Sequence, residues 1–340
     1  MRHGGDIFRN RGIMLDFSVN TNPLGMPGAV RDAIRDHVDD YARYPDALCG
    51  ELRAALARHE GVSEEAICCG NGAADLIFRL CLALRPRHTL ITAPAFSEYE
   101  RAALLAGSRV SRHVLRAEND FTLEPAFLDD ISGGVDLVML CNPNNPTGRL
   151  VESALLTAIL ERCRETGARL VVDECFLPFT HAPSLAGNAA PHLAVLKALT
   201  KTYSLAGIRL GYLIAGDSSL AAKIMDTGQA WSVSAVAQYA GCAALKIPAW
   251  VDEARRLIEA ERPRIMAELR AFGCTAVNSD ANFILFRCET PLLLPLIERG
   301  ILIRTCDSFH GLDGGWYRAG IKRRDENDRL LAALRAILGA

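Results

Sequence analysis

Residues 193–212 read LAVLKALTKTYSLAGIRLGY and bear most directly on the fold. The stretch opens with the apolar run Leu193–Leu196, which is typical of a strand buried on both faces. A polar turn containing Lys201 follows, and a second apolar run extends from Leu210 to Ala215. In such sheets, ligands bind where loops begin at the carboxyl ends of the strands. We therefore predict that Lys201 lies at the ligand-binding edge of a buried sheet.

Strand-like and helix-like segments alternate on both sides of this stretch, from about residue 50 to residue 245. Apolar runs predict further strands at 89–92, 136–141, 169–173 and 210–215. Segments of helical period predict helices at 73–84, 97–106, 153–164 and 219–228. This alternation implies an α/β fold in which helices cover both faces of a mostly parallel sheet.

A different pattern begins at Pro248. A long helical stretch continues to about Gly273, and we expect Pro263 to kink or split it. Strands are then predicted at 282–287, 301–304 and 316–321, with helices at 292–299 and 325–338. Because 340 residues exceed what one core usually supports, we predict an N-terminal arm (1–25), a large α/β domain (26–247) and a small α+β domain (248–340). No flexible linker separates them, so they should pack together.

The balance of charge excludes partners that a strong electrostatic field would recruit. The 38 basic and 40 acidic residues leave a formal net charge of −2, so neither nucleic acid nor an anionic membrane is an expected partner. No run approaches the ~18 apolar residues of a membrane span, and residues 1–6 lack the apolar core of a signal peptide. We expect a cytoplasmic protein with a small-molecule ligand.

The eleven cysteines are odd in number and show no CxxC spacing. Several lie in apolar runs, such as Cys68, Cys69 and Cys141, where they are typical of small core residues. Reduced thiols of this kind are common in reducing compartments, whereas disulfide frameworks and zinc sites have regular spacings. The sequence therefore predicts no metal site.

Lysines are scarce, since only five of the 38 basic residues are lysine: Lys197, Lys201, Lys223, Lys246 and Lys322. A Schiff base with an aldehyde cofactor requires a lysine amine, so the candidates are few. The last three lie in polar contexts typical of solvated surface side chains. Lys201 follows a predicted strand and precedes Arg209, which fits an amine placed beside an anion clamp.

Three polar or small-residue stretches follow other predicted strands. Residues 70–75, Gly-Asn-Gly-Ala-Ala-Asp, precede a helix, and small residues there let backbone N–H groups approach an anion. A purely structural turn would have the same composition. Residues 142–148 and Asp173-Glu174 each follow a strand, and an ordinary loop would explain either one alone. Combined with Lys201 and Arg209, the three stretches predict one site.

Four motifs occur in the order and spacing of the fold-type I aminotransferases: AsnProThrGly at 145–148, Asp173-Glu174, ThrLys at 200–201 and GlyIleArgLeuGlyTyr at 207–212. The chain resembles this superfamily over nearly its whole length. The resemblance implies a pyridoxal phosphate cofactor, with Lys201 as the catalytic residue that holds it as a Schiff base. It also implies that Asp173 pairs with the protonated pyridine nitrogen and that Asn145 donates to the ring 3-oxygen.

The same resemblance implies the other cofactor contacts. The residues that would bind the cofactor phosphate are Gly72, Ala73, Ala74, Thr200 and Arg209. Phe96 would stack on the pyridine ring. Tyr44 resembles a tyrosine that reaches the partner's cofactor phosphate across a homodimer interface, although an exposed turn aromatic has the same sequence context.

Two positions depart from the pattern of the superfamily. Phe176 stands where many aminotransferases have a tyrosine hydroxyl on the ring oxygen, which implies altered ring electronics. Ala198 replaces a common phosphate-binding hydroxyl, which removes one expected phosphate contact.

Segments near both ends of the chain resemble a narrower family. HisGlyGly at 3–5, residues 15–25 and residues 301–318 resemble the threonine-phosphate decarboxylases of cobalamin biosynthesis, which are relatives of histidinol-phosphate aminotransferases. This resemblance implies a phosphoamino acid substrate, O-phospho-L-threonine or O-phospho-L-serine, that loses its carboxylate as carbon dioxide. The implied substrate-binding residues are His3, Gly4, Asn20 and Arg304 for the phosphate, Arg318 for the carboxylate, and Asn145.

Two other functions remain open. An aminotransferase acting on histidinol phosphate or a similar amino acid would share the cofactor site and differ only in its products. A non-catalytic sensor, such as the effector domain of a transcription regulator, would need a fused DNA-binding segment, and residues 1–25 are too short for a helix-turn-helix. The residues do not distinguish threonine phosphate from serine phosphate.

Overall fold

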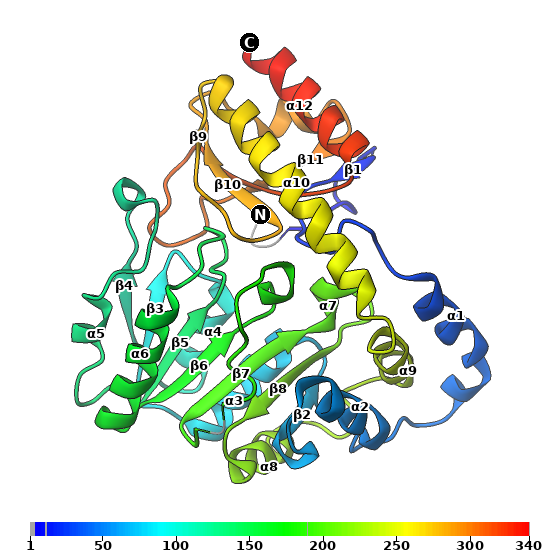
Figure 1. Cartoon of the computed structure of the whole chain (residues 1–340), viewed down its shortest axis with the longest axis vertical. Helices are drawn as coiled ribbons and strands as arrows, with labels where there is room; N and C mark the ends of the chain where they lie inside the picture. The colour runs from blue at the N-terminus through cyan, green and yellow to red at the C-terminus, as the bar shows by residue number, and fades with distance from the viewer. Residues whose placement is uncertain (1–3, 11, 189, 340) are drawn as a thin grey trace.

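A seven-stranded sheet forms the centre of the computed structural model, which describes residues 4–10, 12–188 and 190–339 (Figure 1). Its strands lie in the order β2-β8-β7-β6-β5-β3-β4. Their bounds are β2 (Ile67–Gly70), β3 (His88–Ala93), β4 (Arg109–Val114), β5 (Leu137–Cys141), β6 (Arg169–Asp173), β7 (Leu193–Ala198) and β8 (Gly211–Ala215). Only β8 runs antiparallel to its neighbours, so the prediction of a mostly parallel sheet is confirmed.

The central strands are apolar throughout because both faces of the sheet are covered. Along β5, Met139 packs with helices on one face, whereas Val138 and Leu140 pack on the other, as the two-residue period of a strand requires. The helices of the first face are α3 (Ala73–Leu84), α4 (Ser97–Leu105) and α8 (Ser218–Asp226), and those of the second are α5 (Phe127–Asp130) and α6 (Ser153–Thr166). The sheet is therefore the middle layer of three.

Helices α2 (Gly50–Glu60) and α9 (Ala235–Ala244) cover the outer strands β2 and β8. The remaining helical elements of the region are α1 (Gly28–Asp36), α7 (Leu199–Thr202), and the short turns η1 (Val38–Ala42), η2 (Glu64–Ala66), η3 (Ala117–Asn119) and η4 (Leu177–Phe179). Among these elements α7 matters most for function, because it follows β7 directly and carries Lys201.

A second, antiparallel sheet lies toward the C-terminus, in the order β12-β13-β10-β9. Its strands are β9 (Thr275–Ala276), β10 (Phe283–Arg287), β12 (Arg304–Thr305) and β13 (Trp316–Gly320), and it packs with α10 (Ala249–Ala271), α11 (Leu293–Ile297) and α12 (Arg324–Leu338). The predicted strand 301–304 is divided, because β11 (Ile301–Leu302) pairs instead with β1 (Leu15–Asp16). The N-terminal segment is thereby joined to the C-terminal part of the chain.

Helix α10 runs without interruption through Pro263, so the expectation that proline splits this helix is wrong. A proline inside a helix costs about 3 kcal/mol or more because it removes one backbone hydrogen bond and crowds the preceding turn. The helix buries Ile258, Ile265 and Leu269 in the C-terminal core, on both sides of the proline. Burying each such side chain contributes about 1.5–3 kcal/mol, so tertiary packing outweighs the local cost.

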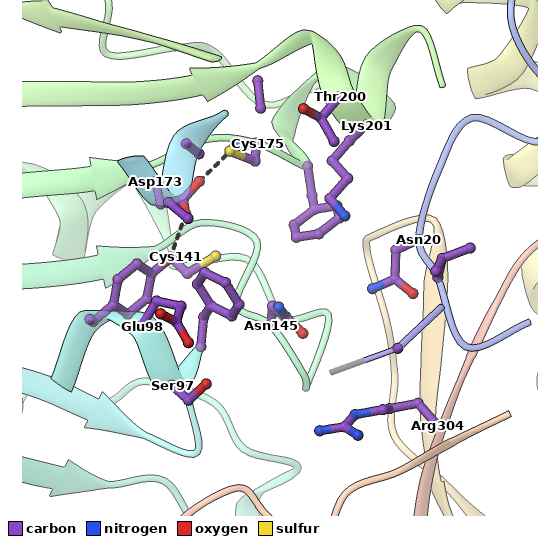
Figure 2. A pocket seen from close by; sticks show the side chains of 18 of the residues that line it. Asn20, Ser97, Glu98, Cys141, Asn145, Asp173, Cys175, Thr200, Lys201 and Arg304 are labelled. Carbon is purple, nitrogen blue, oxygen red and sulfur yellow. Dashed lines mark hydrogen bonds between the residues drawn. The ribbon is translucent and has the colours of Figure 1, made fainter. Parts of the chain in front are cut away.

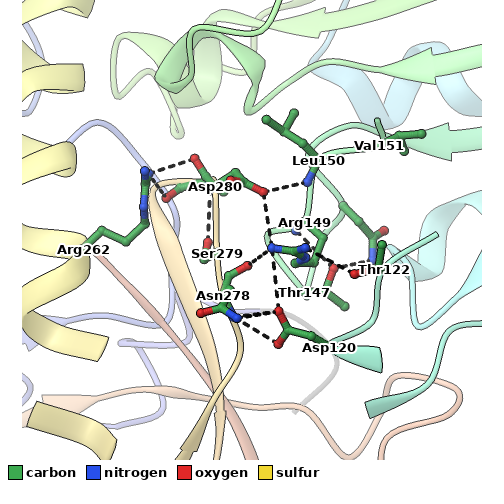
Figure 3. A network of polar contacts seen from close by, with 12 residues as sticks. Asp120, Thr122, Thr147, Arg149, Leu150, Val151, Arg262, Asn278, Ser279 and Asp280 are labelled. Carbon is green, nitrogen blue, oxygen red and sulfur yellow. Dashed lines mark hydrogen bonds and ion pairs between the residues drawn. The ribbon is translucent and has the colours of Figure 1, made fainter. Parts of the chain in front are cut away.

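A polar network holds the loop after β5 against the C-terminal sheet (Figure 3). Arg149 donates to the Asn278 carbonyl at 2.8 Å, and the Leu150 amide donates to the Asp280 carboxylate at 3.0 Å. Gly148 has φ +76°, and a Cβ there would lie 2.2 Å from the Ser279 hydroxyl, so only glycine fits. This network fixes the loop that carries Asn145 between the two sheets.

Every one of the eleven cysteines is a free thiol, and all except Cys242 are buried, as the sequence predicts. Within the described parts of the chain, no helix combines the length and apolar character needed to cross a membrane.

Candidate active site

A cavity of about 420 Å³ opens between the two sheets (Figure 2). The last residues of three neighbouring strands, Cys141, Asp173 and Ala198, form its floor, and β12 and β13 contribute from the opposite side. It therefore lies at the carboxyl ends of the parallel strands, where the sequence places the site. The predicted residues that line it are Gly4, Asn20, Ala73, Ala74, Phe96, Asn145, Asp173, Thr200, Lys201, Arg209, Arg304 and Arg318.

Two predicted residues within the described parts of the chain, Gly72 and Tyr44, are not in that lining. His3 lies outside the described residues, and Gly72 directly precedes Ala73 beneath the Arg209 side chain. Tyr44 is 82% exposed and packs against Trp231, with ring centroids 4.8 Å apart. It borders a separate cavity of about 330 Å³, so within one chain the structure does not bring Tyr44 to Lys201.

Lys201 extends from the short helix α7 into the cavity. Burial, followed by the nearby charge of Arg318, lowers the pKa of its amine from 10.5 to about 8. The Phe176 ring, which stands where a tyrosine is common, lies 5.9 Å from the Lys201 Nζ atom. A larger fraction of this amine is neutral near pH 8 than for an ordinary lysine, which suits a nucleophile that attacks an aldehyde.

Asp173 is buried at the end of β6 and accepts hydrogen bonds from neutral groups. Tyr99 donates its hydroxyl to Oδ2 at 2.5 Å, and the Cys175 amide donates to Oδ1 at 2.9 Å. Burial raises the pKa of Asp173, whereas the bonds from Cys175 and Tyr99 act in the opposite direction. A buried carboxylate with neutral partners is suited to receive a cationic group of a ligand.

An anion cradle forms where β2 leads into α3. The N-terminus of α3, at Ala73 and Ala74, lines the cavity, and Gly72 before it has φ +80°. A Cβ on Gly72 would lie 2.5 Å from the Arg209 Nη2 atom, so the guanidinium lies directly over this turn. Backbone N–H groups, the helix dipole and an arginine together favour a phosphate. Thr200 lines the same cavity, and its hydroxyl donates to the Leu210 carbonyl at 3.1 Å.

Two arginines from the second sheet form the opposite wall. Arg304 and Arg318 are direct cross-strand partners on β12 and β13. Arg318 donates to the Asn145 amide oxygen and to the Ser18 carbonyl, the latter at 2.9 Å. Burial, and to a lesser extent the charge of Arg304, lower the pKa of Arg318 to about 10. Two neighbouring cations in a buried wall favour the binding of anionic groups between them.

Arg304 is itself only 2% exposed. It donates to the Ser308 hydroxyl at 2.8 Å, and its guanidinium lies 5.7 Å from the centre of the Phe309 ring. Burial lowers its pKa as well. Ser308 and Phe309 thus fix the guanidinium beside the cavity.

Asn20 is suited to contact a ligand. Its side chain is 2% exposed and lines the cavity, yet neither Nδ2 nor Oδ1 has a hydrogen-bond partner among the described residues. Buried amide groups are rarely left unpaired in folded proteins, because the lost hydration costs about 1–3 kcal/mol. Gly4 lines the cavity as well and packs closely against Ser18, since a Cβ there would lie 2.1 Å from the Ser18 carbonyl oxygen.

The sequence prediction missed several residues of the site. Tyr99, Cys141 and Cys175 surround Asp173, and Phe309 flanks Arg304. Tyr99 lies three residues after Phe96, which directly precedes the expected helix 97–106, and this spacing is a signal the sequence does contain. Within the described residues, no cluster of three or more His, Cys, Asp or Glu side chains is suited to a metal ion.

Comparison with known proteins identifies the family. Residues 12–334 match the family model described as Aminotransferase class I and II. The chain is 39% identical to the threonine-phosphate decarboxylase of Salmonella typhimurium, over 99% of this chain and 96% of that protein. The chain belongs to the class I and II aminotransferase family, and it is a pyridoxal-phosphate-dependent enzyme.

Two solved structures are similar to the fold described above. The histidinol-phosphate aminotransferase from Clostridium acetobutylicum superposes with a TM-score of 0.89 at 30% identity, covering 96% of this chain and 99% of that one. The L-threonine-O-3-phosphate decarboxylase from Porphyromonas gingivalis superposes with a TM-score of 0.85 at 25% identity, covering 96% and 100%. The predicted fold class is therefore confirmed.

The residues of the cavity fit pyridoxal phosphate. This cofactor presents an aldehyde, a pyridine nitrogen and a phosphate, and the cavity offers the Lys201 amine, the buried Asp173 carboxylate and the cradle at α3 with Arg209. Phe96 lines the same space. When bound, the cofactor withdraws the electron pair that remains when a bond to the substrate Cα breaks.

Proposed function

We propose that this enzyme decarboxylates O-phospho-L-threonine to carbon dioxide and (R)-1-aminopropan-2-yl phosphate. The observation that carries the proposal is a second set of anion-binding groups in the cavity, separate from the cradle at α3. Arg304 and Arg318 lie side by side on β12 and β13, and the unpartnered Asn20 amide faces the same space. One cradle suits the cofactor phosphate, and the second set suits a substrate with both a phosphate and a carboxylate.

The two arginines suit two different anions because their surroundings differ. Arg304 lies near Asn20, Gly4 and the Ser308 hydroxyl, a cluster rich in polar groups, and we assign it to the phosphate. Arg318 is tied to Asn145, at the end of the cavity nearer Lys201, and we assign it to the carboxylate. A planar guanidinium takes either anion through two hydrogen bonds, which a lysine cannot do.

Holding both ends of the substrate decides which bond to Cα reacts. The bond that lies perpendicular to the cofactor ring is the one that breaks, so the side chains select the reaction by orientation. With the phosphate fixed by Arg304, little rotational freedom remains about Cα, and Arg318 sets the direction of the carboxylate. The same residues would accept O-phospho-L-serine, which lacks only a methyl group and would give ethanolamine phosphate.

The decisive experiment measures carbon dioxide released from carboxyl-labelled O-phospho-L-threonine in the absence of a keto acid. Release by the wild type and none by Lys201→Ala is the expected result. The relative from Clostridium acetobutylicum is a histidinol-phosphate aminotransferase, so the alternative is amino transfer from histidinol phosphate to 2-oxoglutarate. That activity without carbon dioxide release would contradict the proposal.

We further propose that the active enzyme is a homodimer in which Tyr44 reaches the partner's cofactor phosphate. Tyr44, Trp231 and Leu48 expose large apolar surfaces, and the rings of the first two pack against each other at a tilt of 34°. Exposed aromatic clusters of this kind are typical of protein interfaces. Because Tyr44 does not line the cavity of its own chain, a role in cofactor binding requires a second copy.

The remaining assignments rest on the organisation of the chain. We propose the division into an arm (1–25), a cofactor-binding domain (26–247) and a small domain (248–340), which the two separate sheets support. His3 remains a predicted phosphate ligand next to Gly4. The eleven free thiols support a reducing compartment, and we propose the cytoplasm.

A further inference from the structure

Asp173 has hydrogen-bond partners that the proposed reaction does not account for. Tyr99 comes from α4, Cys141 from β5, Cys175 follows β6, and Lys201 comes from α7. These are the titratable groups that face the carboxylate from the elements packed around it. Three of the four are missing from the motifs that identify the cofactor site.

The donors are arranged so that each carboxylate oxygen receives one. The Tyr99 hydroxyl lies 2.5 Å from Oδ2, and the Cys175 amide lies 2.9 Å from Oδ1. The Cys175 thiol donates to the same carboxylate (Figure 2). Cys141 contacts the Tyr99 hydroxyl and also donates to the Pro143 carbonyl at 3.1 Å. The carboxylate is therefore held from two sides.

These donors favour the ionised carboxylate. Burial raises the pKa of the Tyr99 hydroxyl and of the Cys175 thiol far above neutral, so both keep their protons and can donate. A backbone N–H can only donate. Without such donors, burial of Asp173 would favour its neutral form, which cannot form an ion pair with a protonated ring nitrogen.

We propose that Tyr99 and Cys175 are positioning residues that hold the Asp173 carboxylate in its ionised form and in the orientation in which it meets the cofactor's ring nitrogen. The inference depends on pyridoxal phosphate being the cofactor and not on which substrate is used. Both residues contact the Asp173 carboxylate, and the proposal is that they act through it.

The test uses cofactor labelled with ¹⁵N in the ring and loaded into the apoenzyme. In Tyr99→Phe and Cys175→Ala, the ring-nitrogen resonance should move toward that of unprotonated pyridine, because Asp173 competes better for the shared proton. The cofactor dissociation constant should rise about tenfold in Tyr99→Phe, the effect of losing one charge-assisted hydrogen bond. Cys175→Ser keeps a side-chain donor and should restore the wild-type resonance.

Tyr212→Phe is the matched control. The Tyr212 hydroxyl also donates to a carboxylate, Glu60, at 2.6 Å, and the residue is buried in β8 outside the cavity lining. This variant should leave the ¹⁵N resonance unchanged. An unchanged resonance in both Tyr99→Phe and Cys175→Ala, or an equal change in Tyr212→Phe, would overturn the proposal. Should Tyr99→Phe fail to fold, as judged by melting of the apoenzyme, Cys175→Ala and Cys175→Ser decide the question.

Discussion

Lys201 shows how burial prepares a single side chain for covalent chemistry. Its pKa is lowered from 10.5 to about 8, first by burial and then by Arg318. Only the neutral amine attacks an aldehyde, so the rate at which the apoenzyme captures pyridoxal phosphate should rise with pH with a midpoint near pH 8. Stopped-flow absorbance checks this, and borohydride reduction with peptide mapping should place the cofactor on Lys201. A midpoint near pH 10.5 would show that burial has no such effect.

Arg304 should be required for both binding and orientation of the substrate. Replacement by alanine removes a charge-assisted contact worth about 1.5–3 kcal/mol, so kcat/KM for phosphothreonine should fall at least about tenfold. Because the contact also orients the substrate, kcat should fall together with binding. Arg304 is buried, so thermal unfolding of the variant is measured in parallel. Unchanged kinetics in a folded Arg304→Ala protein would remove the residue from the substrate site.

Most residues that line the cavity could be predicted from the sequence, whereas their supporting contacts could not. Lys201, Asp173 and Asn145 follow predicted strands, so their positions indicated a common site, whereas the resemblance to the aminotransferases implied their roles. Tyr99 and Cys175 lie among ordinary helix and strand residues, and only the folded sheet brings them to Asp173. The pairing of Arg304 with Arg318 likewise depends on strand register, which no local pattern specifies.

At the scale of the element, prediction succeeded where local pattern and tertiary packing agree. Helix α3 has the bounds 73–84 that its apolar period predicts. The strand expected at 301–304 is divided because β11 and β12 pair with different partners, β1 and β13. The first of these partners is 286 residues away in the chain, so the division could not be read from local sequence.

The turn between β2 and α3 depends on a glycine, Gly72, that lies against Arg209. Gly72→Ala would strain a backbone conformation with φ +80° and would push a methyl group against the Arg209 guanidinium, 2.5 Å away. The cofactor dissociation constant should therefore rise about tenfold or more, as expected when a charge-assisted phosphate contact is lost. Fluorescence titration of the apoenzyme measures it.

Gly61→Ala serves as the control for the turn variant. Gly61 also has a positive φ, +69°, but a Cβ there meets nothing within 4 Å. Its replacement should lower the stability by about 1 kcal/mol and leave cofactor binding unchanged. Equal loss of cofactor affinity in both variants would mean that backbone strain, and not the position of Arg209, is responsible.

The whole molecule brings together parts of the chain that are distant in sequence. The N-terminal segment pairs with β11, so Gly4 and Asn20 face Arg304 and Arg318 near the other end of the chain. The polar network at Arg149 and Asp280 fixes the loop of Asn145 against the same sheet (Figure 3). The side of the cavity that we assign to the substrate therefore forms only when the large and small sheets are assembled.

Tyr44 would make the site depend on two chains. If Tyr44 serves the partner's cofactor, Lys201→Ala and Tyr44→Ala each damage both sites of their own homodimer. After subunit exchange, a mixed dimer has one site with both residues intact and one with neither. Since about half of the dimers in an equal mixture are mixed, activity should recover to about a quarter of the wild-type level.

A mixture of Lys201→Ala with the double variant Lys201→Ala/Tyr44→Ala has no intact site and should stay inactive. No recovery in the first mixture, with exchange shown by mass spectrometry, or full activity of a monomer in sedimentation, would contradict a shared site.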